Sequence, residues 1–193
     1  MSTSDAVKEA SDRLAQLERK RNMAVESSRA ITRRTKNMIH AIHVHDDYGD
    51  IAKDLQRDVD SVNAELSGEP SVLYSAVLQD ALGEYAEAFI FAAVVDGEDV
   101  PSFDSLRISP QAWVMGLADS IGEMRRMVLT YLIEGDLEKA RCLFERMESI
   151  GDDVLGFDVP DAVAPIRRKQ DVARSIIEKT RSDITNAMMM SKK

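Results

Sequence analysis

Apolar residues recur at helical spacing through most of the 193-residue chain, and no segment shows the alternation that a strand requires. No Gly or Pro occurs between Met1 and Tyr48, and the apolar positions there fit one helix from about residue 5 to 45. At 1.5 Å per residue such a helix is about 60 Å long. Because a compact domain of this size is narrower than that, part of the helix is expected to project or to pack on a neighbour.

Turn signals divide the remaining residues into further helices. Gly49 precedes a second helix that ends at about Leu66, and Ser67-Gly68-Glu69-Pro70 is a stop-and-restart signal. A third helix is predicted from about Ser71 to Val95; it is apolar on nearly all sides, which is typical of a buried helix. After a polar loop at 96–108, further helices are predicted at about 110–133, 137–155 and 166–188. The sequence therefore predicts an all-α bundle of about six or seven antiparallel helices, forming one domain over residues 1–193.

The composition is that of a globular protein, with 44% hydrophobic and 31% charged residues. No apolar run reaches the roughly 18 to 20 residues that a bilayer span needs, so no membrane partner is expected. The first residues lack the apolar stretch of a secretory signal. The one cysteine, Cys142, rules out an internal disulfide framework. Together these features favour a cytoplasmic protein.

The net charge of −9 is unevenly distributed along the chain. Residues 1–45 contain nine basic and five acidic residues, and residues 165–193 contain eight and three. The middle segment, 46–164, contains eight basic and twenty-six acidic residues. The basic ends permit binding of a polyanion, whereas the acidic middle suits cation binding or solubility.

Two acidic pairs interrupt helices that are otherwise apolar. Glu84 and Glu87 are three residues apart and share a helix face, and Asp119 and Glu123, four apart, share a face of the next long helix. Burying carboxylates is costly unless a cation pairs with them. Their hard oxygen atoms suit Mg²⁺ or Mn²⁺, and the absence of a neighbouring His argues against Zn²⁺ and against a di-iron site. A bound Mg²⁺ could activate water and neutralise charge on a phosphodiester.

A second interpretation of these carboxylates needs no metal. Arg125 and Arg126 lie beside them in the sequence, and Arg126 shares the stripe of Asp119 and Glu123, so a buried ion-pair network could satisfy the same side chains. Spacing alone leaves both interpretations open. In the same helix Gly116 and Gly122 each lower helix propensity by about 1 kcal/mol relative to Ala. Close approach of another backbone would account for both glycines.

A basic stretch lies on the first predicted helix. It comprises Arg21, Arg29, Arg33, Arg34 and Lys36. These residues are candidates for contacts with RNA phosphates, with Arg29 and Arg33 the strongest. The alternatives are a solvated helix face and ion pairs with acidic segments of a neighbour. No aromatic residues interleave with the stretch, so base stacking is not indicated.

His40, His43 and His45 form a cluster at the end of the first helix. Three imidazoles so close together could bind a metal. However, His45 points away from the face that His40 and His43 share, and cations suit a helix C-terminus in any case. The cluster is therefore more simply a helix end than a metal site.

Several motifs, in order, resemble the translin superfamily, and within it the branch of translin-associated factor X. Ser28-Arg29-Ala30-Ile31-Thr32 and Lys36 resemble a segment of the first helix of the family, and Glu84-Tyr85-x-Glu87-Ala88 resembles its third-helix motif. The longest match runs from Leu106-Arg107-Ile108-Ser109-Pro110 through Gly116-x-Ala118-Asp119-x-x-Gly122-Glu123-x-x-Arg126-Met127. Gly135-Asp136 and Gly156-Phe157 fall at the family's turns. The resemblance covers about residues 15 to 187.

This resemblance implies an all-α bundle of seven helices that assembles into a closed, hollow octamer. It also implies a Mg²⁺-dependent endoribonuclease acting mainly on single-stranded RNA, because the catalytic, metal-binding carboxylates of the factor X branch match Glu84, Glu87, Asp119 and Glu123. Glu123 either completes the ligand set or serves as the general base. Translin itself lacks the full acidic set and mainly binds nucleic acid.

Alternatives to this assignment are a non-catalytic shell that binds single-stranded RNA or DNA, and a purely structural helical oligomer. The expected assembly is an octamer of identical chains. A mixed shell with a second subunit of the translin family is the other possibility.

Overall fold

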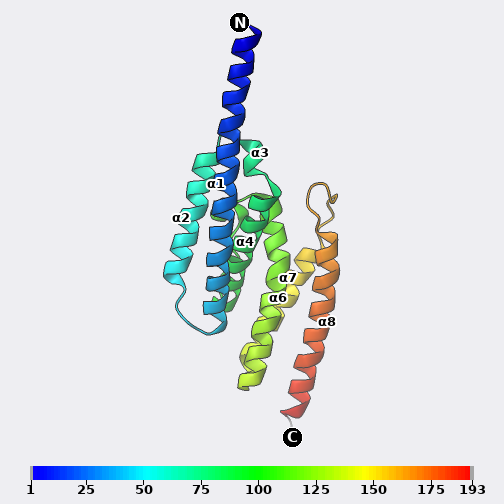
Figure 1. Ribbon diagram of the computed structural model, residues 1–193. Coiled ribbons are helices and arrows are strands. Elements are labelled where there is room, and N and C mark those ends of the chain that lie inside the picture. Colours follow the sequence, from blue (N-terminus) through cyan, green and yellow to red (C-terminus); the bar gives the residue numbers. More distant parts are fainter. Residues whose placement is uncertain (1, 192–193) are drawn as a thin grey trace.

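The computed structural model describes residues 2–191, which contain eight helices and no strand (Figure 1). The helices are α1 (Thr3–His43), α2 (Gly49–Leu66), α3 (Pro70–Leu73), α4 (Ala76–Asp96), α5 (Phe103–Leu106), α6 (Pro110–Glu134), α7 (Leu137–Leu155) and α8 (Arg167–Met190). The prediction of an all-α bundle is confirmed. None of the described helices is both long and apolar enough to cross a bilayer.

The 41-residue α1 projects beyond the bundle at its N-terminal end (Figure 1). It begins at a capping box, in which Asp5 N–H donates to the Ser2 side chain and the Ser2 N–H donates to the Asp5 carboxylate. Arg13 ties this part of α1 to the bundle by donating two 2.7 Å hydrogen bonds to Glu69. The predicted projection of the first helix is therefore confirmed.

The prediction of one helix from Ser71 to Val95 is wrong in one respect, because the backbone breaks at Tyr74 and Ser75 to give α3 and α4. The apolar pattern runs on across this break, which hides it. Ser75 takes the extended conformation of an N-cap residue, and the buried Gln79 side chain donates to the Leu73 carbonyl, which satisfies the end of α3. The predicted loop at 96–108 likewise contains the short helix α5.

The ends of the later helices follow the expected chemistry. Ser109 Oγ accepts a 3.0 Å hydrogen bond from Ala112 N–H, with Pro110 in the first turn of α6. Gly135 ends α6 at φ +81°, a conformation that favours glycine. Asp136 then caps α7 by accepting from Lys139 N–H at 3.0 Å.

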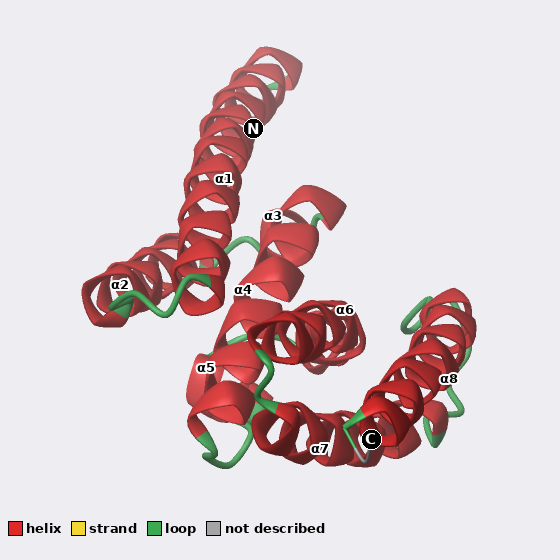
Figure 2. Cartoon of the chain, turned by 90° about the horizontal axis from the view of Figure 1, so that it is seen from below, coloured by secondary structure: helices red, strands yellow, loops and turns green. Residues whose placement is uncertain are grey.

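Helix α4 lies at the centre of the bundle, packed between α1 and α6. Helix α2 packs on α1, while α7 and α8 pack on α6 and on each other (Figures 1 and 2). The predicted burial of the third long helix is confirmed for α4, whose buried residues lie on almost every side. The core thus brings the two helices that carry the acidic pairs into direct contact.

Gly116 sets the distance between α4 and α6. A Cβ added there would lie 2.5 Å from Gly83 O, 2.7 Å from Ala86 Cβ and 2.8 Å from Glu87 N, so only glycine fits. Close approach of another backbone is therefore confirmed as the reason for Gly116. It is wrong for Gly122, around which an added Cβ would meet nothing within 4 Å.

Candidate active site

The four predicted carboxylates of Glu84, Glu87, Asp119 and Glu123 line one cavity of about 440 Å³. Helices α4 and α6 supply them as two pairs, and the contact at Gly116 holds the pairs side by side. The C-terminal half of α1 forms the opposite wall with Thr35, Lys36, Ile39 and His40, and Arg126 of α6 completes the lining.

Glu87 has the most perturbed carboxyl group of the four. Burial, reinforced by the nearby charges of Asp119, Glu123 and Glu84, raises the pKa of Glu87 to about 8. A carboxylate whose neighbours repel it in this way is stabilised by a nearby cation, because the cation favours the ionised form. The cavity therefore has the electrostatic character of a cation-binding site.

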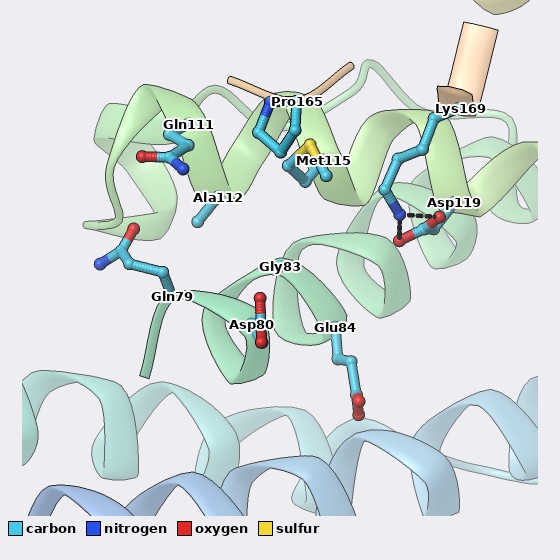
Figure 3. Close-up of a pocket in the computed structure, with 10 residues that line it drawn as sticks. All are labelled: Gln79, Asp80, Gly83, Glu84, Gln111, Ala112, Met115, Asp119, Pro165 and Lys169. Atoms are coloured by element: carbon cyan, nitrogen blue, oxygen red, sulfur yellow. Dashed lines mark hydrogen bonds and ion pairs between the residues drawn. The ribbon is translucent and has the colours of Figure 1, made fainter. Parts of the chain in front are cut away.

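Asp119 is paired with a lysine that sequence reasoning missed. Lys169, in the first turn of α8, donates to both carboxylate oxygens of Asp119 (Figure 3). The pair lies in the wall of a second cavity, of about 360 Å³, which Glu84 also lines. In Figure 3 the Glu84 side chain points away from this pair. The excess of basic residues at 165–193 indicated that this segment could supply partners for the acidic residues. No sequence pattern showed which of its basic residues would reach α6.

Glu123 is held from the other side by α1. His43 Nε2 donates a 2.5 Å hydrogen bond to Glu123 Oε2, and this bond is the main cause of the lowered pKa of Glu123. The expectation that no histidine lies near the carboxylates is therefore wrong: His40 lines the cavity and His43 contacts a member of the set. Residues some 80 positions apart meet here through packing, which spacing along one helix cannot reveal.

The two arginines expected as alternative partners behave differently. Arg126 Nη1 lies 3.7 Å from Glu123 Oε2. Arg125 turns to α8, where it donates to Thr180 at 2.8 Å and is paired with Asp183 at 3.0 Å. Within residues 2–191 no three His, Cys, Asp or Glu side chains converge closely enough to hold a metal ion. Asp119 and Glu123 instead turn to Lys169 and His43.

The predicted RNA-binding residues separate into three groups. Arg29, Arg33 and Lys36 are exposed at helical spacing on α1, with His40 one turn further, so they form a stripe that leads to the carboxylate cavity. Arg34 faces α2 and is ion-paired with Asp58. Arg21 lines a different cavity, beside α3 and the start of α4.

The three histidines do not form one site. His45, at φ +56°, stacks on Tyr131 and lies 3.9 Å from Glu134, away from the face of His40 and His43. The expectation that His45 points elsewhere is thus confirmed.

Comparison with known proteins places this geometry in a family. A model of the Translin family matches residues 2–182. The chain belongs to the translin family. The uncharacterized protein MJ0175 of Methanocaldococcus jannaschii is 32% identical over 175 residues, covering 89% of this chain and 78% of that protein.

Solved structures of translin-type proteins share the fold. AfC3PO in complex with duplex RNA superimposes with a TM-score of 0.88 at 32% identity, covering 96% of this chain and 97% of that one. The crystal structure of AfC3PO gives a TM-score of 0.89 at 31% identity over 97% and 100% of the two chains. Apo-NeC3PO gives 0.83 at 24% identity over 97% and 98%, a likeness of fold alone. The translin-like architecture is thereby confirmed.

Proposed function

We propose that this translin-family chain is a Mg²⁺-dependent endoribonuclease that acts mainly on single-stranded RNA. The observation that supports the proposal most is the single cavity lined by Glu84, Glu87, Asp119 and Glu123, in which burial, reinforced by mutual repulsion, raises the pKa of Glu87 to about 8. Carboxylates crowded in this way repel one another, and a bound cation would offset that repulsion.

The donor set fits Mg²⁺, with Mn²⁺ as the second choice, because all four ligand candidates offer carboxylate oxygens. Glu84, Glu87 and Asp119 would hold the ion, and Glu123 would complete the set or accept the proton of the attacking water. When bound, the ion stabilises negative charge on the phosphodiester and lowers the pKa of a bound water. Asp119 and Glu123 are free to serve only after their contacts with Lys169 and His43 rearrange.

RNA as the ligand is supported by the basic stripe of α1 and by the relatives. Arg29, Arg33 and Lys36 lead along one helix face to the cavity, where Arg126 stands on the opposite helix. Exposed guanidinium and ammonium groups at this spacing can follow a phosphate backbone. AfC3PO, at 32% identity, has been solved in complex with duplex RNA.

The decisive experiment incubates the protein with labelled single-stranded and duplex RNA, in Mg²⁺ and in EDTA. We expect cleavage of the single strand that requires Mg²⁺ and falls at least a hundredfold in Glu87→Gln and in Asp119→Asn. Glu178→Gln, an exposed carboxylate of α8, is the matched control and should cleave normally. Cleavage that persists in EDTA or in both site variants would refute the proposal.

The second candidate function is a non-catalytic shell that binds single-stranded RNA or DNA. It is favoured by the pairing of Asp119 with Lys169 and of Glu123 with His43, which satisfies both carboxylates without a metal. It predicts RNA binding of equal affinity in Mg²⁺ and in EDTA, with no cleavage product in either. A purely structural oligomer would bind no RNA even at low salt.

Assembly into a homo-octamer is part of the proposal, with a second translin-family subunit as the alternative partner. Its support is the projecting arm of α1, on which Val7 is 64% and Leu14 66% exposed at a spacing of seven residues. Apolar residues at this spacing commonly pack against another helix. Light scattering after size exclusion should give eight times the 21.5 kDa mass of one chain, and a monomer would contradict this part of the proposal.

A further inference from the structure

Lys169 occupies a position that the proposed function does not explain. Its Nζ lies within hydrogen-bonding distance of both carboxylate oxygens of Asp119, one of the proposed metal ligands (Figure 3). The pair is partly accessible, since 27% of the Lys169 side chain and 41% of the Asp119 side chain are exposed. A cation from the protein itself therefore sits on a carboxylate that the metal would need.

The ion pair is not the only contact that holds the start of α8 to the bundle. The next residue, Gln170, donates to the carbonyls of Val154 at 3.0 Å and Phe157 at 2.8 Å, which fixes the same turn of the helix. Ile166 and Ala173 are buried on either side of it. Because these contacts anchor the start of α8 without Lys169, the lysine is available for a second role.

Space and charge both permit the ammonium to move. Lys169 lines the cavity of about 360 Å³ on the α8 side of Asp119, so Nζ can swing away without displacing a packed side chain. The other charged residues lining that cavity are Asp80, Glu84 and Asp119, all of them acidic. The flexible four-carbon stem of lysine allows such a movement at little cost.

We propose that Lys169 is a built-in counter-ion that competes with the divalent metal for Asp119. In the metal-free protein it neutralises Asp119 and keeps the acidic cavity stable. The metal can engage Asp119 only when the ammonium leaves, and the freed ammonium then stands at the edge of the active site, where it can pair with a substrate phosphate. This inference rests on the proposed metal site.

The competition makes a prediction that an ordinary structural salt bridge does not. Removing the positive charge of Lys169 should strengthen metal binding, because the metal ion then has no ammonium to displace from Asp119. A partly exposed ion pair of this kind corresponds to roughly a two- to fivefold gain in affinity. The same change should weaken binding of single-stranded RNA in the presence of metal, since one phosphate contact is lost.

The test is calorimetric titration of Mn²⁺ into EDTA-stripped, dialysed protein. Four proteins are compared: wild type, Lys169→Gln, Lys169→Arg and, as a matched loss of charge on the same helix, Lys179→Gln. We expect Lys169→Gln to bind Mn²⁺ about two- to fivefold more tightly than wild type, Lys179→Gln to match wild type, and Lys169→Arg to bind no more tightly. Thermal unfolding in EDTA should show that all four proteins fold.

Each alternative outcome is informative. Equal Mn²⁺ affinity in wild type and Lys169→Gln, or an equal gain in Lys179→Gln, would overturn the competition while leaving the metal site intact. Absence of Mn²⁺ binding in every protein would instead remove the proposed function, and the competition with it. If Lys169→Gln fails to fold, tighter binding by Lys169→Arg would overturn the proposal, because that variant retains the competing charge.

Discussion

His43 Nε2 lies 2.5 Å from Glu123 Oε2, so a buried imidazole in the last turn of α1 is tied to α6 inside the candidate active site. The ring also packs on Phe91, with centroids 5.0 Å apart. His43→Ala removes both contacts and leaves a cavity. We expect it to lower the free energy of unfolding by about 2 to 4 kcal/mol in EDTA, measured by urea denaturation. Cleavage of RNA should fall by about tenfold or more, because Glu123 loses its orientation.

The control for this prediction is His45→Asn. His45 is half-exposed, and Asn tolerates its positive φ, so stability should change by less than about 0.5 kcal/mol. Equal losses in the two variants would mean that the His43–Glu123 bond has no special part in the site.

Gly116 and Gly122 form a matched pair within α6. Gly116→Ala forces a Cβ against the backbone of α4, which should cost about 1 to 3 kcal/mol of stability and displace Glu87 relative to Asp119. Gly122→Ala meets nothing and should gain about 0.5 to 1 kcal/mol from helix propensity. Thermal and urea unfolding of the two variants test this, and a stabilised Gly116→Ala would show that the helices can separate freely.

The sequence predicts what depends on neighbours along the chain. Ser109, Gly135 and Asp136 mark helix ends by hydrogen bonds to residues within a turn, and those ends are where expected. The break at Tyr74 and Ser75 could not be predicted, because the apolar pattern continues across it. The Gln79 side chain, which donates to the Leu73 carbonyl at the end of α3, makes that contact only in the folded structure.

The candidate site divides in the same way. Glu84 with Glu87, and Asp119 with Glu123, are visible as pairs because each pair occupies one helix face. His43 and Lys169 reach these carboxylates from α1 and α8, at separations of 80 and 50 residues. Only packing brings them there, and helical periodicity contains no information on which α8 residue faces α6.

Glu87 makes stability depend on pH. Its pKa of about 8 in the folded protein exceeds the ordinary 4.5, so between these values the folded state retains a proton that the unfolded state releases. Stability from this group is therefore fully present below about pH 4.5 and is lost as the pH rises through about 8. The Glu87→Gln variant does not lose this stability at high pH, because the Gln side chain does not titrate. In EDTA we expect its stability relative to wild type to increase between pH 5 and pH 9 in urea unfolding, and a constant difference would contradict the shifted pKa.

Arg29 and Arg33 of the α1 stripe are expected to contribute to the affinity for RNA. Both side chains are exposed on the face of α1 that leads to the cavity, whereas Arg34 on the opposite face is paired with Asp58. In a Glu87→Gln background, which prevents cleavage, the double substitution Arg29→Ala and Arg33→Ala should weaken binding of single-stranded RNA. It should also make the slope of log affinity against log salt shallower by about 1 to 2, as expected for two lost phosphate contacts. Arg34→Ala should leave that slope unchanged, and fluorescence anisotropy at several salt concentrations measures both. A slope that changes with Arg34 but not with Arg29 and Arg33 would move the RNA path to the α2 side of α1.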